Sequence, residues 1–124
     1  MPSITRVGDA PAHEMHGFTF TPLATPSRGS SQLALWTVDA PARSASPQHS
    51  MSHDEVFLVQ SGRLVAAVAG EDVELTPGDA LTVPAHASFR LTNPFDEPAR
   101  LVACTTAGMR ATVGEHTIAP PWAA

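Results

Sequence analysis

Proline and glycine interrupt this chain along its whole length. The 124 residues include twelve prolines and eight glycines, and no window of about 11 residues free of them shows an apolar repeat of 3.6 residues. Short apolar or alternating runs lie between the interruptions, at 17–23, 32–38, 55–60, 63–69, 73–75, 80–83, 88–92 and 99–106. Short strands separated by turns are typical of a β-sandwich or barrel. The sequence therefore predicts an all-β fold with little helix.

The runs 55–60 and 63–69 are apolar on both faces, and the dipeptide Ser61-Gly62 separates them. Glycine tolerates the positive φ that a tight hairpin needs. We expect the two runs to pair as central strands, covered on both sides, in the middle of a two-sheet sandwich.

One domain over residues 1–124 is predicted, with a core at about 17–117 and an arm at each end. Hydrophobic residues make up 43% of the chain and charged residues 15%, which is typical of a folded domain and not of a disordered chain. The C-terminal arm carries Pro120-Pro121-Trp122, which docks either against the body or against a second subunit. An arm of this kind also covers sheet edges, so we expect a homodimer.

Charge and residue usage exclude several classes of function. The net charge is −5, and the seven basic residues are dispersed arginines, which argues against a nucleic-acid surface. Lysine and tyrosine are absent from the sequence, so Schiff-base chemistry and phenolic acid catalysis are excluded. The single cysteine, Cys104, cannot form an intrachain disulfide. With no secretory apolar segment and no run near the ~20 residues that a bilayer requires, we expect a cytoplasmic protein without membrane contact.

The stretch from His49 to Glu55 carries the chemistry. Its residues are His-Ser-Met-Ser-His-Asp-Glu. Successive side chains of a strand alternate between its faces, so His49, Met51, His53 and Glu55 share a parity and are expected on one side. Imidazole and carboxylate groups that converge on one point are typical ligands of a divalent metal.

This stretch resembles the first motif of the cupins, small double-stranded β-helix proteins. That motif is similar to Gly-x5-His-x-His-x3-Glu-x6-Gly. Here His49, Met51, Glu55 and Gly62 follow its spacing, with methionine where the second histidine stands.

The second cupin motif, similar to Gly-x5-Pro-x-Gly-x2-His-x3-Asn, is matched between Gly78 and Asn93. Pro84 is in place, whereas His86 stands at the glycine position and Phe89 at the histidine position. The resemblance implies a double-stranded β-helix, or jelly-roll barrel, with its site inside, and it is close to small cupins of high-GC bacteria.

In metal-binding cupins, both histidines and the glutamate of the first motif hold the ion together with the histidine of the second. Carried over residue by residue, His49 and Glu55 remain. His53, His86 or the thioether of Met51 would replace the missing ligands, and a methionine ligand would favour copper. The resemblance thus implies a divalent transition metal such as Fe, Mn, Zn, Ni or Cu.

The three histidines also have simpler interpretations. His49 is alternatively a hydrogen-bonded core histidine, His53 an exposed residue at the rim beside Asp54, and His86 a turn residue.

The other residues of the motifs are expected to form a pocket. Met51, Phe57 and Phe89 are interpreted as its apolar walls. Glu55 stands at the head of an apolar run, where a buried carboxylate needs a partner or a metal.

We expect a small-molecule enzyme that uses a metal, of the dioxygenase, isomerase, lyase or polyketide-cyclase type, since all of these occur on the cupin fold. One alternative is a metal-free cupin that binds an apolar or sugar-like ligand without catalysis. Another keeps catalysis without metal, with Glu55 as general base and a histidine as donor.

Overall fold

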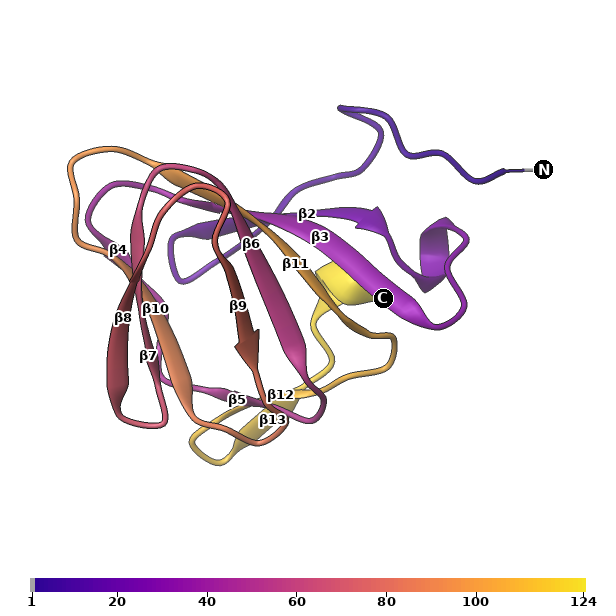
Figure 1. Cartoon of the computed structure of the whole chain (residues 1–124). Helices are drawn as coiled ribbons and strands as arrows, with labels where there is room; N and C mark the ends of the chain where they lie inside the picture. Colours follow the sequence, from indigo (N-terminus) through magenta and orange to yellow (C-terminus); the bar gives the residue numbers. More distant parts are fainter. Residues whose placement is uncertain (1) are drawn as a thin grey trace.

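Three antiparallel sheets enclose one core in the computed structural model, which describes residues 2–124 (Figure 1). The largest sheet has the strand order β1-β2-β3-β11-β6-β9, and the second has the order β4-β10-β7-β8. A small third sheet, β13-β12-β5, lies at the lower end of the molecule in this view.

The eight runs predicted from the sequence are all strands, with ends within two residues of the predicted ones, so the all-β prediction is confirmed. The large sheet consists of β1 (His13–Met15), β2 (Phe18–Ala24), β3 (Leu33–Ala40), β6 (Glu55–Ser61), β9 (Ala80–Val83) and β11 (Ala99–Thr106). The second sheet consists of β4 (Ser44–Ala45), β7 (Leu64–Val68), β8 (Glu71–Leu75) and β10 (Phe89–Asn93). The third consists of β5 (Ser50–Met51), β12 (Ala111–Val113) and β13 (His116–Ile118).

The core lies between the sheets and is built by alternation along their strands. In β3, Ala34, Trp36, Val38 and Ala40 are buried, whereas the residues between them are partly exposed. The central strand β11 pairs with β3 on one side and with β6 on the other. The large sheet therefore presents a continuous apolar face to the interior, as in other sandwiches with one face toward the core.

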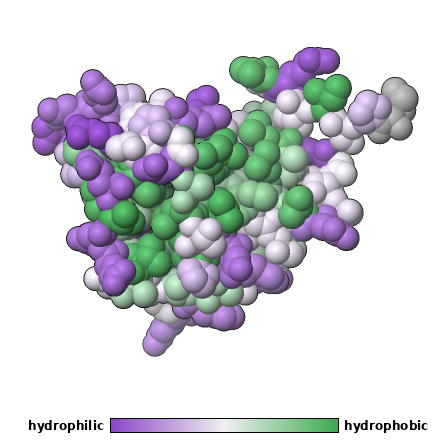
Figure 2. All heavy atoms as spheres, in the orientation of Figure 1, coloured by the Kyte–Doolittle hydropathy of each residue, from purple (hydrophilic) through white to green (hydrophobic). Residues whose placement is uncertain are grey.

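The outer face of β6 is not covered, so the prediction of a strand buried on both sides was wrong for the single chain. The expected pairing of the runs 55–60 and 63–69 was also wrong, because β6 pairs with β9 and β11 in the large sheet whereas β7 pairs with β8 and β10 in the second sheet. Val56 and Leu58 are 38% and 43% exposed. Figure 2, in the orientation of Figure 1, shows apolar side chains gathered on this side of the molecule. The neighbouring inward residues Phe57 and Val59 are buried. The homodimer expected from the sequence would cover such a face, and it stays a prediction.

Helix is a minor component, as predicted. It is limited to two short 3-10 helices, η1 (Pro26–Arg28) and η2 (Pro121–Ala123), within the part of the chain that the structure describes. Across the same residues, no helix has the length and apolarity needed to cross a membrane. The cytoplasmic location stays a prediction.

Gly62, between β6 and β7, is required by a close backbone approach. Its φ is +76°, which L side chains rarely adopt. A Cβ atom at this position would overlap the carbonyl oxygen of Pro98 and lie 2.7 Å from the Cα atom of Ala99. The glycine thus lets the β6–β7 turn pack against the start of β11.

We predict that Gly62→Ala lowers the free energy of unfolding by at least about 2 kcal/mol, because backbone overlap adds to the strain of positive φ. Gly70→Ala is the matched control. Gly70 lies in the β7–β8 hairpin at φ +86° with no heavy atom within 4 Å of the added Cβ, so Gly70→Ala should lower the free energy of unfolding by about 1 kcal/mol. Urea unfolding of both variants measures the difference, and equal losses would contradict this account of Gly62.

Candidate functional site

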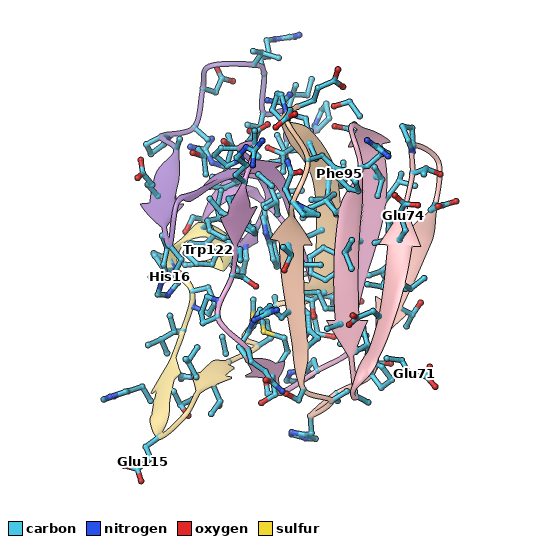
Figure 3. The ribbon with its side chains drawn as sticks, turned by 90° about the vertical axis from the view of Figure 1, so that its left-hand side faces the viewer. His16, Glu71, Glu74, Phe95, Glu115 and Trp122 are labelled. Atoms are coloured by element: carbon cyan, nitrogen blue, oxygen red, sulfur yellow. The ribbon has the colours of Figure 1, made fainter. Side chains whose placement is uncertain are left out.

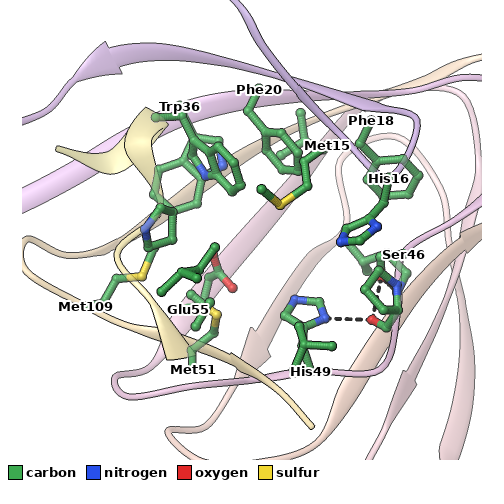
Figure 4. A pocket seen from close by; sticks show the side chains of 18 of the residues that line it. Met15, His16, Phe18, Phe20, Trp36, Ser46, His49, Met51, Glu55 and Met109 are labelled. Carbon is green, nitrogen blue, oxygen red and sulfur yellow. Dashed lines mark hydrogen bonds between the residues drawn. The ribbon is translucent and has the colours of Figure 1, made fainter. Parts of the chain in front are cut away.

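An apolar cavity of about 90 Å³ lies inside the barrel (Figure 4). Five aromatic side chains line it, namely Phe18, Phe20, Trp36, Phe57 and Trp122, together with three methionines, Met15, Met51 and Met109. The polar side chains among the lining residues are His16, Ser46, His49 and Glu55. A mostly apolar cavity with a few polar groups is typical of a small-molecule site.

Glu55 is brought into the cavity by the strand that it begins. It pairs with Thr105 of β11 and with Val83 of β9, and the Thr105 hydroxyl donates a hydrogen bond to the Asp54 carbonyl at 2.5 Å. Every second residue of β6 is buried, beginning with Glu55 and followed by Phe57. The carboxyl group therefore points into the same apolar interior as the core side chains.

The Glu55 side chain is buried without a polar partner. Its exposed fraction is 3%, and among residues 2–124 no group donates a hydrogen bond to its carboxyl oxygens or forms an ion pair with them. Burial raises the pKa of Glu55 to about 8, because a low-dielectric surrounding disfavours the charged form. Near neutral pH the group is mostly a neutral acid, and its hydroxyl can donate a hydrogen bond.

His49 is held in one tautomer by a backbone contact. Its Nδ1 atom lies 2.8 Å from the carbonyl oxygen of Pro47, and a carbonyl only accepts, so Nδ1 carries the proton. Burial, opposed by this hydrogen bond, lowers the pKa of His49, and the nearby His16 lowers it further. The Nε2 atom is therefore a free acceptor, and Figure 4 shows it on the side of the ring toward Glu55.

Glu55 and His49 share the cavity without contacting each other. Among the residues described, neither a hydrogen bond nor an ion pair joins the two side chains. Both line the same cavity. Different atoms of one ligand can thus contact the neutral acid and the imidazole nitrogen.

Two of the predicted metal ligands, His53 and His86, lie outside the cavity. His53 is exposed and its Nδ1 atom lies 2.8 Å from the Ser52 hydroxyl. His86 is exposed in a turn at φ +68°. The parity argument fails for His53 because residues 52–54 form a bend between β5 and β6, and alternation applies only along a continuous strand.

Phe89, at the position of the second-motif histidine, packs behind His49 and not at the cavity surface. The ring centroids of the two residues are 4.1 Å apart, and the backbones are joined by a bridge in which each N–H donates to the other's carbonyl at 2.8 to 2.9 Å. Met51 and Phe57, the other two predicted walls, line the cavity. Phe89 therefore positions the imidazole without facing a ligand.

The donor atoms around the cavity do not fit the divalent transition metal implied by the resemblance. Protein sites for such ions usually combine three or more side-chain ligands. Across residues 2–124, no three His, Cys, Asp or Glu side chains lie close enough together to hold a metal ion. His16, His49 and Glu55 all line the cavity, with Met51 adding a thioether, but the three side chains are not grouped closely enough to share one ion. No catalytic step is therefore assigned to a metal.

The site residues predicted from the sequence do not include most of the cavity lining, of which His16 and Trp36 are two examples. His16 and Gly17 both have positive φ in the β1–β2 turn, which brings the imidazole to the cavity. For His16, the sequence showed only a histidine in a segment expected to be an N-terminal arm. The arms also fold further than expected, since β1 begins at His13 and η2 extends to Ala123.

Both tryptophans of the chain have a buried and unpartnered donor. Among the residues described, the Nε1 atoms of Trp36 and Trp122 have no hydrogen-bond partner. A buried donor without a partner costs about 1–3 kcal/mol. Of the two docking modes considered for Pro120-Pro121-Trp122, the structure has the segment against the body, where Trp122 is buried beside Phe20.

Three solved structures illustrate the range of proteins with a similar fold. The polyketide cyclase RemF from Streptomyces resistomycificus is 16% identical, with a TM-score of 0.77, over 86% of this chain and 80% of that one. A sugar phosphate isomerase of the cupin superfamily from Silicibacter pomeroyi is 23% identical, with a TM-score of 0.67, over 81% and 67%. Salicylate 1,2-dioxygenase from Pseudoaminobacter salicylatoxidans is 20% identical, with a TM-score of 0.72, over 86% and 31%. At these identities the likeness concerns the fold alone.

Sequence comparison gives the family. No curated protein matches the chain at a significant level. The family model described as "Cupin domain" matches residues 34–105, which is 72 of the 124 residues and so more than half of the chain. The matched segment runs from β3 to β11 and contains both motifs, His49 and Glu55. The jelly-roll barrel, its structural neighbours and this match agree, and the chain belongs to the cupin family.

Proposed function

We propose that this cupin is an enzyme that transfers a proton within a small, largely apolar carbonyl compound, with His49 as the base and Glu55 as the acid. The observation that carries the proposal is geometric. A carboxyl group and an imidazole with its Nδ1 atom bound to the backbone face one apolar cavity and do not contact each other. Acid–base catalysis needs this arrangement, in which donor and acceptor reach different atoms of one substrate.

The protonation states support these roles, which reverse the sequence-based expectation of Glu55 as base and a histidine as donor. Glu55 holds its proton near neutral pH because burial raises its pKa, and His49 is neutral because burial lowers its pKa. The pair is thus uncharged, which is the form that an apolar cavity tolerates. The hydroxyl group of Glu55 can donate a hydrogen bond to a substrate carbonyl oxygen. The Nε2 atom of His49 can accept a proton from an acidic C–H group beside that carbonyl.

The reaction follows from the two contacts. The Nε2 atom of His49 takes the proton from the carbon next to the carbonyl, and the electron pair of that C–H bond forms a carbon–carbon double bond. The carbonyl π electrons move to the oxygen, which receives the Glu55 proton and becomes an enol. In a conjugated enol, transfer of the His49 proton to another carbon, with return of the enol hydroxyl proton to Glu55, gives an isomer. Attack by the enol carbon on a second carbonyl gives a ring when His49 protonates the new alkoxide and the former enol hydroxyl returns its proton to Glu55. Such proton transfers contribute roughly 10²–10⁴ in rate.

The lining residues favour a neutral substrate. Within the part of the chain that is described, none of the residues lining the cavity is arginine, so nothing there offers the bidentate pairing that a phosphate or carboxylate prefers. Two neighbours are named a cyclase and an isomerase, and both names are compatible with proton transfer at a carbonyl compound.

A deuterium-exchange experiment tests the proposal. We expect the protein to accelerate exchange of the α-protons of 2-tetralone, a bicyclic ketone, in D2O, as followed by proton NMR. His49→Gln should slow this exchange about 100-fold or more, whereas His53→Gln, a control on the exposed side of the bend, should leave it unchanged.

The same experiment separates the two other functions expected from the sequence. Loss of exchange on treatment with a chelator, with recovery on addition of one divalent metal, would favour a metal-dependent enzyme. Binding of 2-tetralone without faster exchange would favour a ligand carrier. Exchange that survives His49→Gln would contradict the assignment of the base.

A pH-dependent stability is also predicted from Glu55. The folded state holds the Glu55 proton up to a pH of about 8, whereas the unfolded chain releases it near its ordinary pKa of 4.5. The folded state therefore binds more protons between these values, and the free energy of unfolding falls as the pH rises, by about 3 kcal/mol from pH 5 to pH 8. Urea unfolding of wild type and Glu55→Gln measures this contribution, and parallel pH profiles would contradict it.

A further inference from the structure

The indole of Trp122 lies flat against the ring of Phe20 inside the barrel, and we call this position its seat. Its ring stacks on Phe20 with centroids 3.9 Å apart and planes 10° from parallel. Trp122 is 7% exposed and lines the same cavity as Glu55 and His49, and Figure 3 labels it among the side chains of the fold. A planar aromatic group thus occupies part of the cavity that also contains the acid and the base.

The segment that carries this indole has few bonds to the rest of the chain. Among residues 2–124, the backbone hydrogen bond that joins 120–124 to another part of the chain is donated by Ser27 to the Ala124 carbonyl, at 3.4 Å. The other backbone bonds of the segment, from Ala123 to Pro120 and from Ala124 to Pro121, close its own turn. The preceding residues, 114–119, are exposed. Stacking and apolar burial therefore hold the segment, without a network of hydrogen bonds.

The seated position also leaves Trp122 with an unsatisfied donor. Its Nε1 atom is buried without a partner, although an indole N–H is usually bonded when it is buried. Withdrawal from the barrel would give this N–H a water partner. In the seated state, the stacking of Trp122 on Phe20 is favourable, whereas the burial of its N–H group without a partner is unfavourable. Because the two effects oppose each other, a ligand that stacks equally well can displace the indole.

We propose that the indole of Trp122 stands in for a planar aromatic part of the ligand, and that segment 120–124 is displaced when such a ligand stacks on Phe20. The ligand class is then an aryl carbonyl compound, and the carbonyl part of this assignment rests on the proposed function. The size of the cavity agrees with displacement. About 90 Å³ remains beside the seated indole, whereas sites for drug-sized ligands usually have roughly 300–1,000 Å³.

The experiment uses the two indole N–H signals of the protein in ¹⁵N NMR spectra, assigned with Trp36→Phe and Trp122→Phe. Chromone, a planar bicyclic ketone, is the probe. On its addition to wild type, the Trp122 signal should move to the position of a solvent-exposed indole. Trp122→Ala should bind chromone at least tenfold more tightly, because the free protein no longer has to release its own indole.

Two outcomes overturn the displacement. Chromone that binds while the Trp122 signal stays at its buried position shows that the ligand site lies elsewhere. Equal or weaker chromone binding by Trp122→Ala, or no binding by either protein, shows that Trp122 is a permanent wall. The wild-type spectrum gives the answer even where Trp122→Ala is unstable.

Naphthalene, a planar bicycle without an oxygen, separates this inference from the proposed function. Displacement of Trp122 by both compounds, with tighter binding of chromone, supports both. Equal affinities for chromone and naphthalene support displacement by an aryl group while they contradict the carbonyl contact with Glu55. Glu55→Gln should still release the Trp122 signal, since stacking on Phe20 does not depend on catalysis.

Discussion

The burial of one carboxyl group, that of Glu55, determines the chemistry of this barrel. A charged carboxylate in an apolar cavity needs an ion partner, a metal or several hydrogen-bond donors. Among residues 2–124 the group has none of these side-chain partners, so the folded state favours the neutral acid. A neutral acid donates a proton, whereas a carboxylate only accepts. The role of base then falls to His49, whose orientation the Pro47 carbonyl sets.

Much of the fold could be predicted from the sequence because turn chemistry is local. Proline and glycine end each strand where they occur, and the eight predicted strands are present with ends within two residues. The environment of each face could not be predicted in the same way. Val56 and Leu58 are as apolar as core residues, yet they are partly exposed, because the second sheet covers only the inner face of β6. Hydrophobicity alone does not tell a core face from a face that is left uncovered.

The candidate site was predictable at four residues, since His49, Met51, Glu55 and Phe57 were expected there from the motifs and all line the cavity. The remainder depends on long-range geometry. A bend at 52–54 interrupts the alternation that would have turned His53 inward. Trp122 and His16 reach the cavity from segments far apart in the chain. No local sequence pattern predicts that these two segments pack against the barrel. The short strands β1 and β13 that position them are only three residues long, which is below the length at which alternation is recognisable.

The acid and the seated indole depend on each other. Glu55 stays neutral because it is buried in an apolar cavity, and Trp122 is one of the side chains that line this cavity. If the indole leaves and water enters, desolvation of the carboxyl decreases and its pKa falls toward the ordinary value. If an aromatic ligand takes the same place on Phe20, the surroundings of the carboxyl group stay apolar and the acid keeps its proton. Displacement by a ligand, as opposed to simple opening, thus preserves the protonation state that the reaction needs.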